Sequence, residues 1–332
     1  MSTLHNDAFL DIQNLNVTFT GGRKPVRAVS GVNLRVKKGE VVALIGESGS
    51  GKSVTLRSIL RLHPPGRSKI EGKILVDGRD VVSMPNAELT NFRGKVASMI
   101  FQEPLLALDP VYTVGEQIIE AIRRHENISK DEARKRALSL FERVRIPSPE
   151  RRLDAYPHEM SGGMRQRAMI SLALASEPKL LLADEPTTAL DATVQIQILL
   201  LLRELQRELG LSVVFVTHDL GAAVEVADRI AVMYAGRIVE EGSTRTLMRS
   251  PRHPYTRALL KSLAHGSVSK GTRLETIPGS PPDLSALPPG CTFADRCSLA
   301  QDACRESIPE ISQINPEHSA RCFRLEQTTE AI

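Results

Sequence analysis

The chain has 332 residues, of which 41% are hydrophobic and 25% are charged, as in an ordinary soluble globular protein. Its formal net charge of +4 is too small to indicate nucleic-acid binding, and no apolar run is long enough to span a bilayer. Residues 1–10 lack the apolar stretch of a signal peptide. We therefore expect a cytosolic protein that meets a membrane only through a partner.

The first half of the chain begins with strands and continues with helices. Residues 10–45 alternate apolar and polar side chains and end in an apolar run, which predicts antiparallel strands leading into a buried strand. Further strands are expected at 74–78 and 96–101. Helical periodicity runs from 114 to about 144, and another helix is expected from Ser161 to about 176.

The second half alternates short apolar runs with helical segments. Apolar runs at 180–183 and 213–216 predict buried strands, and the helix expected between them runs from 194 to 209. Two more strands are expected at 230–234 and 238–240. This alternation predicts an α/β fold with a mostly parallel sheet, in which the helical insert at about 103–176 forms a subdomain.

A glycine-rich loop stands between the buried strand and the next helix, and it fits the phosphate-binding pattern of P-loop proteins. Glycines let the backbone N–H groups approach phosphates at a helix N-terminus. Lys52 can reach the β- and γ-phosphates, and the Ser53 hydroxyl can ligate Mg²⁺. A plain surface loop would explain the glycines too, but the flanking strand and helix argue against it. The expected ATP-binding residues here are Gly46, Glu47, Ser48, Gly49, Ser50, Gly51, Lys52 and Ser53.

Two carboxylates, Asp184 and Glu185, follow the apolar run at 180–183. Ligands bind at the carboxyl ends of strands in open α/β sheets. Asp184 can hold Mg²⁺ through water, and Glu185 can act as the base for an attacking water. Taken alone, Asp-Glu after a strand is as typical of a turn or of a helix N-terminus.

The segment 161–167 resembles the signature loop of ATP-binding cassette (ABC) ATPases, over a region of similarity that covers about residues 8–265. Two departures are Met164, where the family usually has Gln, and Phe19, where Tyr is more usual. The resemblance implies that each of these motif positions has a role. Gln102 would contact Mg²⁺ in catalysis, and His218 would be the catalytic switch that contacts the γ-phosphate. Ser161, Gly162 and Gly163 would contact the ATP of a partner subunit, and Asp191 of Ala189-Leu190-Asp191 would belong to the D-loop. Phe19 would lie against the adenine ring.

This resemblance implies an ABC-type nucleotide-binding domain with an antiparallel β subdomain and a helical subdomain. We expect the ATPase domain at 1–265 and a small Cys-rich C-terminal extension at 266–332. ATP would lie between the phosphate loop of one subunit and the signature of another. A monomer is therefore expected to be nearly inactive.

The segment 251–260, the proline-rich stretch after it and the cysteines resemble ATPase subunits of bacterial oligopeptide/dipeptide importers. The resemblance implies a peripheral protein on the cytoplasmic face of the inner membrane. Its expected partners are a second ATPase subunit, homologous or identical, two permeases and an extracytoplasmic binding protein, with no nucleic acid. Importers of nickel, glutathione or sugars share these features.

Two different classes of protein also contain a phosphate loop. A soluble ABC ATPase of translation usually carries two cassettes in one chain, and one of DNA repair interrupts its cassette with a long coiled coil, whereas this chain has a single signature and a short insert. A P-loop kinase or GTPase would have neither the signature at 161–167 nor a counterpart of His218. Both classes are therefore less consistent with the sequence than a transporter ATPase.

The four cysteines of the chain, Cys291, Cys297, Cys304 and Cys322, all lie near the C-terminus. Their segment is too small to fold by apolar burial, so metal ligation would supply the missing free energy. Disulfides are disfavoured in the cytosol. Zinc suits four thiolates, but its usual Cys-x-x-Cys pairs are absent. The wide spacing, together with the resemblance, favours a [4Fe–4S] cluster, with His318 as a bystander.

Overall fold

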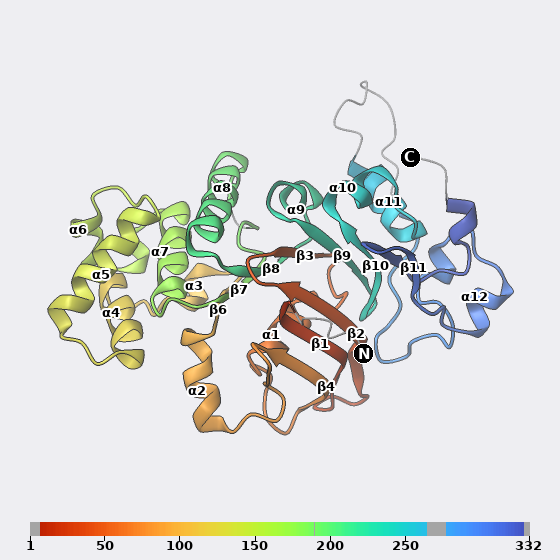
Figure 1. Cartoon of the computed structure of the whole chain (residues 1–332), viewed down its shortest axis with the longest axis horizontal. Coiled ribbons are helices and arrows are strands. Elements are labelled where there is room, and N and C mark those ends of the chain that lie inside the picture. The colour runs from red at the N-terminus through yellow and green to blue at the C-terminus, as the bar shows by residue number, and fades with distance from the viewer. Residues whose placement is uncertain (1–6, 189, 264–276, 329–332) are drawn as a thin grey trace. The chain divides into compact units, whose positions relative to one another are not determined.

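The computed structural model describes residues 7–188, 190–263 and 277–328 (Figure 1). The chain divides into two compact units. The first unit consists mainly of Ser83–Val216 together with Val36–Val41. The second contains Leu10–Arg35, Val42–Val82 and the chain from Thr217 onward. The domain boundary expected at 265/266 lies outside the described residues, so that division stays a prediction.

The first unit is built on three parallel strands, β6 (Ala97–Ile100), β7 (Leu180–Asp184) and β8 (Ser212–Thr217), in that order. Every residue of β7 and β8 is buried. This burial explains the uninterrupted apolar runs of the sequence, because a parallel strand is covered on both faces. The strands place the carboxyl end of β7, with Asp184 paired to Val216, at one edge of this part of the sheet.

The helices of the first unit lie mostly between β6 and β7 in the sequence. The periodic segment 114–144 forms two helices, Val114–His125 and Lys130–Arg143. The second helix begins after Ser129, whose Oγ accepts the Glu132 N–H and caps it. Thr113 and Glu116 form a reciprocal capping box at the start of the first. The helices are α2 (Asn86–Lys95), α3 (Pro104–Ala107), α4 (Val114–His125), α5 (Lys130–Arg143), α6 (Pro149–Leu153), α7 (Gly162–Leu174) and α8 (Ala192–Leu209), with a 3₁₀ turn at Pro157–Glu159.

The second unit contains a four-stranded sheet of order β2-β1-β4-β5. Its β1–β4 and β4–β5 pairs are antiparallel, as the alternating pattern of the N-terminal sequence predicts. Buried and exposed side chains alternate along the second half of β2. The strands are β1 (Ala8–Phe19), β2 (Val26–Lys37), β4 (Ser68–Val76) and β5 (Arg79–Asp80).

A second group of strands in this unit brings the C-terminal extension onto the sheet. Strand β3 (Val41–Ile45) pairs in parallel with β9 (Arg229–Tyr234), which forms a hairpin with β10 (Arg237–Ser243). The sequence patterns do not predict the next two strands, β11 (Ser312–Asn315) and β12 (His318–Ala320), of which β12 pairs with β10. The helices are α1 (Lys52–Ile59), α9 (Leu220–Val226), α10 (Thr244–Arg249), α11 (Pro254–Leu263) and α12 (Asp302–Glu306), with 3₁₀ turns at Ala294–Arg296 and Leu325–Thr328.

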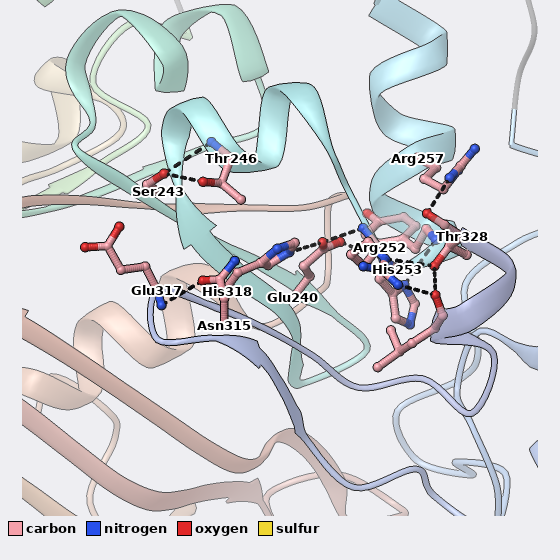
Figure 2. A network of polar contacts seen from close by, with 12 residues as sticks. Glu240, Ser243, Thr246, Arg252, His253, Arg257, Asn315, Glu317, His318 and Thr328 are labelled. Carbon is pink, nitrogen blue, oxygen red and sulfur yellow. Dashed lines mark hydrogen bonds and ion pairs between the residues drawn. The ribbon is translucent and has the colours of Figure 1, made fainter. Parts of the chain in front are cut away.

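A buried carboxylate fastens this extension to the sheet (Figure 2). Glu240 on β10 has no exposed surface, and one of its oxygens lies 2.7 Å from His318 Nε2 on β12. The backbone N–H groups of Arg252 and His253 also donate to it, at 2.6 and 2.8 Å. Burial alone would raise the pKa of Glu240, but these hydrogen bonds outweigh burial and lower that pKa. One charged group therefore ties together three separate segments.

This network predicts acid lability. Burial lowers the pKa of His253 from 6.5 to about 4, so the folded protein keeps this ring neutral while the unfolded chain takes up a proton below pH 6.5. The folded-state pKa of Glu240 is also lowered, so its contribution to stability is lost at still lower pH. We expect the free energy of unfolding to fall by about 3 kcal/mol between pH 7 and pH 4 from His253 alone.

Urea unfolding followed by circular dichroism across this pH range measures the loss. His253→Asn is the matched variant, because an amide oxygen can still accept the Tyr255 N–H that His253 Nδ1 accepts at 3.1 Å. The unfolding free energy of this variant should change less between pH 6.5 and pH 4 than that of the parent. An equal slope in parent and variant would show that His253 does not titrate in this way.

Candidate active site

The phosphate loop joins β3 to α1, and two of its glycines are required by the backbone. Gly46 and Gly51 have φ angles of 153° and 99°. A Cβ on Gly46 would lie 2.1 Å from the Met233 carbonyl oxygen, and one on Gly51 would lie 2.4 Å from that of Ala28. Neither approach is possible for another residue. The loop is therefore held close against neighbouring backbone.

Polar groups inside this loop suit a bound phosphate. Gly51 is the N-cap of α1 and supplies no side-chain hydrogen bond there. The Ser50 hydroxyl is buried and makes no hydrogen bond with any described residue. Lys52 is 4% exposed, and its Nζ donates to the carbonyl oxygens of Gly46 and Glu47 at 2.8 and 3.0 Å. An anion at this helix N-terminus would meet a cation, a hydroxyl donor and backbone N–H groups together.

Phe19, the expected adenine contact, ends β1 in the second unit and is half-buried. Its ring meets that of His63 edge to face, with the centroids 5.4 Å apart. Burial lowers the pKa of His63, so this imidazole is the neutral form at pH 7. His63 was not among the residues expected from the sequence. No motif contains it, and only its position after α1 brings it to Phe19.

The candidate catalytic carboxylate lies at the carboxyl end of β7. Glu185 has a left-handed φ of 47°, which is strained for a residue with a side chain, and its N–H donates to Val216 O at 2.9 Å. One of its side-chain oxygens accepts from Gln102 Nε2 at 3.3 Å and from Thr188 Oγ1 at 2.9 Å. The structure thus brings two predicted residues together and adds Thr188, which the motif patterns do not single out.

The three expected Mg²⁺ ligands belong to two different units. Asp184 is fully buried at the end of β7 and lies with Gln102 in the first unit, whereas Ser53 belongs to the second. In the ranges that the structure describes, no group of three or more His, Cys, Asp or Glu side chains could hold a metal ion. Phosphate oxygens of a nucleotide usually complete the coordination of Mg²⁺.

The signature residues form the start of α7 in the first unit. Ser161 caps this helix by accepting the Met164 N–H at 3.3 Å, while Ser161 and Gly162 are themselves exposed. A Cβ on Gly163 would lie 2.9 Å from Val194 of α8. Asp191 caps α8 by accepting the Val194 N–H at 3.0 Å, so the D-loop residue is fixed beside the signature. Ala189 lies outside the described residues.

His218 directly follows the buried strand β8 and is exposed. The turn around it is ordered by its neighbours. Thr217 Oγ1 accepts the Asp219 N–H at 2.9 Å, and Asp219 caps α9 by accepting two backbone N–H groups. The side chain at position 218 therefore lies between the end of β8 and the start of α9, a helix that the sequence patterns do not predict, and its contact with a γ-phosphate stays a prediction.

The four cysteines line one small pocket, whose free volume is about 10 Å³. Cys304 is buried and the other three are half-buried, and all four are free thiols. Backbone N–H groups point at two of the sulfurs, from Leu299 to Cys297 at 3.4 Å and from Arg324 to Cys322 at 3.3 Å. His318 is absent from the pocket lining and is bound to Glu240 instead.

The environment of three of these thiols disfavours the thiolate form when no cation is present. Burial raises the pKa of Cys291 and of Cys297, and it raises that of Cys322 to about 11. The free thiols of Cys291, Cys297 and Cys322 would therefore stay protonated at pH 7 and would be poor nucleophiles. A positively charged metal centre would reverse this preference, because it stabilises the thiolate form directly. The raised pKa values therefore argue against a reactive cysteine at these three positions.

Comparisons with known proteins agree with this geometry. A family model described as "ABC transporter" matches residues 29–188. A second model, "oligopeptide/dipeptide transporter, C-terminal region", matches residues 239–304. Among solved structures, the "dimeric structure of MJ0796, a bacterial ABC transporter cassette" has a TM-score of 0.64 and 34% identity, covering 71% of this chain and 99% of that one. A related structure is described as a post-hydrolysis state bound to ADP and Pi.

Three curated relatives match nearly the whole chain. A "probable peptide ABC transporter ATP-binding protein" of Sinorhizobium fredii is 49% identical, over 96% of this chain and 95% of that protein. The oligopeptide transport ATP-binding protein OppD of Bacillus subtilis is 48% identical, over 95% and 88%. The dipeptide transport ATP-binding protein DppD of the same organism is 47% identical, over 97% and 96%. The α/β fold, the antiparallel sheet and the helical region are those of an ABC cassette, and the chain belongs to the family of ATP-binding subunits of oligopeptide/dipeptide ABC transporters.

Proposed function

We propose that this chain hydrolyses ATP to ADP and phosphate and thereby drives the import of dipeptides or oligopeptides through a membrane complex. The observation that carries hydrolysis is the Glu185 carboxylate at the end of β7, held by Gln102 and Thr188. The match of residues 239–304 to the oligopeptide/dipeptide transporter region supports a peptide cargo. Nickel, glutathione and sugars are the competing cargoes.

Each site residue then has a role in nucleotide binding or hydrolysis that follows from its chemistry. The phosphate loop binds the phosphates through its backbone, and Lys52 neutralises the β- and γ-phosphates. Ser53, Gln102 and Asp184 would hold Mg²⁺, which supplies charge neutralisation at the phosphates when it is bound. Glu185 orients and deprotonates the attacking water, and His218 contacts the γ-phosphate. Phe19 contacts the adenine ring.

A second cassette is expected to complete each nucleotide site. Ser161 to Gly163 are exposed or half-exposed at the N-terminus of α7, where backbone donors suit the γ-phosphate of a partner's ATP. The solved ABC transporter cassette of similar fold is described as dimeric, which supports this arrangement. The partner is either a second copy of this chain or a homologous ATPase subunit.

Permeases provide the expected link to the membrane. Among the described residues, no helix is both long enough and apolar enough to cross a bilayer. Around α3, by contrast, large apolar side chains are exposed, which is typical of a protein-binding surface. They are Phe101, Leu105, Leu106, Val111 and Tyr112. We propose that one of two permeases docks here and holds the subunit at the cytoplasmic face of the inner membrane, with an extracytoplasmic binding protein on the other side.

Reconstitution tests this function. The chain, its partner ATPase, two permeases and the binding protein are placed in liposomes, and ATP hydrolysis and uptake of labelled dipeptides and oligopeptides are measured. Peptide should stimulate both activities, whereas nickel ions, glutathione or a disaccharide should not. The isolated chain should hydrolyse ATP weakly and in a concentration-dependent manner. Strong hydrolysis by the dilute chain, unaffected by permeases, would favour a soluble ABC ATPase instead.

We further propose that Cys291, Cys297, Cys304 and Cys322 hold a [4Fe–4S] cluster. The four thiols line one pocket. Their spacing lacks the Cys-x-x-Cys pairs that are usual for zinc, and a cluster spreads its thiolates over four irons. The N–H groups directed at Cys297 and Cys322 suit thiolate ligands. The role would be structural.

The full-length chain purified without oxygen should therefore be brown and contain about four irons. Cys322→Ser should remove most of the iron and lower the thermal unfolding temperature, because metal binding contributes to folding here. Ser298→Ala is the matched control, since Ser298 is exposed beside Cys297, and it should keep the iron. Colourless anaerobic protein that contains one zinc would replace the cluster with a zinc site, and metal-free protein would contradict both.

A further inference from the structure

The cysteine pocket and the phosphate loop are joined by one arginine. Arg296 lies in the 3₁₀ turn between two of the cysteines, and its side chain is 6% exposed. Its two terminal nitrogens donate to the two carboxylate oxygens of Glu47, at 2.8 and 3.0 Å. Glu47 is the second residue of the phosphate loop, 249 residues away in the sequence. A two-pronged contact of this kind fixes direction as well as distance.

The arginine is itself held from several sides. Its Nε donates to Pro278 O at 2.9 Å, and one terminal nitrogen lies 3.1 Å from the Tyr234 hydroxyl. The guanidinium lies 5.7 Å from the ring centre of Tyr234 and 5.9 Å from that of Phe293. A planar, buried and multiply bonded guanidinium has little freedom to follow a displaced partner. Its position is therefore determined by the extension.

The cysteine pocket determines where this turn lies. The turn is closed by hydrogen bonds from the Ala294 N–H to Cys291 O at 3.0 Å and from the Cys297 N–H to Ala294 O at 3.2 Å. The Cys291 N–H also donates to Cys304 O at 2.7 Å. Phe293 lines the cysteine pocket and packs against Tyr234. Disorder at the cysteines would therefore move Arg296.

On the other side, Glu47 is connected to the residue that binds phosphate. The Glu47 N–H donates to the Tyr255 hydroxyl at 2.9 Å, and Glu47 O accepts from Lys52 Nζ at 3.0 Å. Releasing the Glu47 side chain would leave the loop held by fewer contacts. A loop that must be ordered by the ligand binds that ligand more weakly than a preorganised one.

We propose that Arg296 is a positioning residue that makes the nucleotide affinity of the phosphate loop depend on the integrity of the four-cysteine site. The proposal rests on the nucleotide and cysteine-site functions proposed above and adds a coupling between them. Coupling between two binding sites is reciprocal, so nucleotide must also stabilise the cysteine site. The extension thereby gives the ATPase a dependence on its own correct metal loading.

The first experiment measures binding of the non-hydrolysable analogue AMP-PNP with Mg²⁺ to the full-length chain. Arg296→Gln should weaken binding about 5- to 20-fold, which is less than the roughly 10- to 150-fold for losing a direct charged hydrogen bond to the ligand, because Arg296 acts through Glu47. Arg296→Lys should restore part of the affinity, because it keeps the charge without the fork. Arg305→Gln is the matched control, since Arg305 is exposed in the same extension, and should bind like the parent.

A kinetic readout separates positioning from loss of structure. In the reconstituted transporter, Arg296→Gln should raise the KM for ATP with little change in kcat, because the loop supports the ground state and the transition state alike. Its iron content and thermal unfolding temperature should match those of Arg305→Gln. Equal loss of kcat and iron content would show that the variant only unfolds the extension, and would overturn the proposal.

The coupling itself is tested by a double-mutant cycle with Cys322→Ser. Cys322→Ser should weaken AMP-PNP binding in the parent but not further in Arg296→Gln. Conversely, AMP-PNP should slow the release of metal to a chelator in the parent but not in Arg296→Gln. If no metal is bound, AMP-PNP should slow thiol labelling in the same way. Additive losses, or parent-like affinity in Arg296→Gln, overturn this proposal alone. A parent chain that binds no AMP-PNP overturns the nucleotide function together with it.

Discussion

Glu185→Gln in the reconstituted transporter is expected to bind ATP with parental affinity and to hydrolyse it about 10²- to 10⁴-fold more slowly, the range for loss of a general base. The structure makes this substitution conservative in geometry. A Glu185 oxygen accepts hydrogen bonds from Gln102 and Thr188, and an amide oxygen accepts them equally well. The variant removes the negative charge and the basicity while keeping the shape of the side chain.

Single-turnover hydrolysis of labelled ATP, with AMP-PNP affinity measured in parallel, separates the chemical step from binding. Glu208→Gln is a suitable control, because Glu208 is exposed on α8 and carries the same charge change. It should hydrolyse ATP at the parental rate. Parental hydrolysis by Glu185→Gln would show that another group serves the attacking water.

The parts of the site that the sequence predicts are those whose spacing encodes backbone geometry. Gly46 and Gly51 stand where carbonyl oxygens exclude a Cβ, so their pattern specifies one loop conformation. Ser161 is an N-cap residue type directly before a predicted helix, and it accepts a backbone N–H in the structure. Local rules suffice at such positions, because the interacting groups are within a few residues of one another.

The parts that the sequence does not predict depend on contacts between distant segments. Glu240 stands in a polar stretch and would be expected at the surface, yet it is fully buried and bound to His318. The short strand β12 has no strong apolar pattern, and only its pairing with β10 defines it. Nothing in the sequence around Arg296 distinguishes it from a surface arginine, and only the structure shows its contact with Glu47. No local pattern contains such information.

Lys52→Ala is expected to weaken ATP binding about 10- to 100-fold, in contrast to Glu185→Gln. Lys52 is 4% exposed at the first position of α1, and its Nζ donates to two carbonyl oxygens of the phosphate loop. Taking an ammonium group out of water is unfavourable, and the negative charge of a bound phosphate offsets that cost. Truncation removes this attraction, and it leaves the chain folded because the buried charge is removed as well.

Calorimetric titration of the full-length chain with MgATP measures the affinity, and thermal unfolding without nucleotide checks the fold. Lys52→Arg should not recover parental affinity, since its planar fork is larger than the ammonium that the closed loop accommodates. Lys38→Ala, an exposed lysine before β3, is the charge-matched control and should bind like the parent. If Lys52→Ala bound ATP as tightly as Lys38→Ala, the phosphates would have to lie away from this loop, and the glycine geometry would need another ligand to explain it.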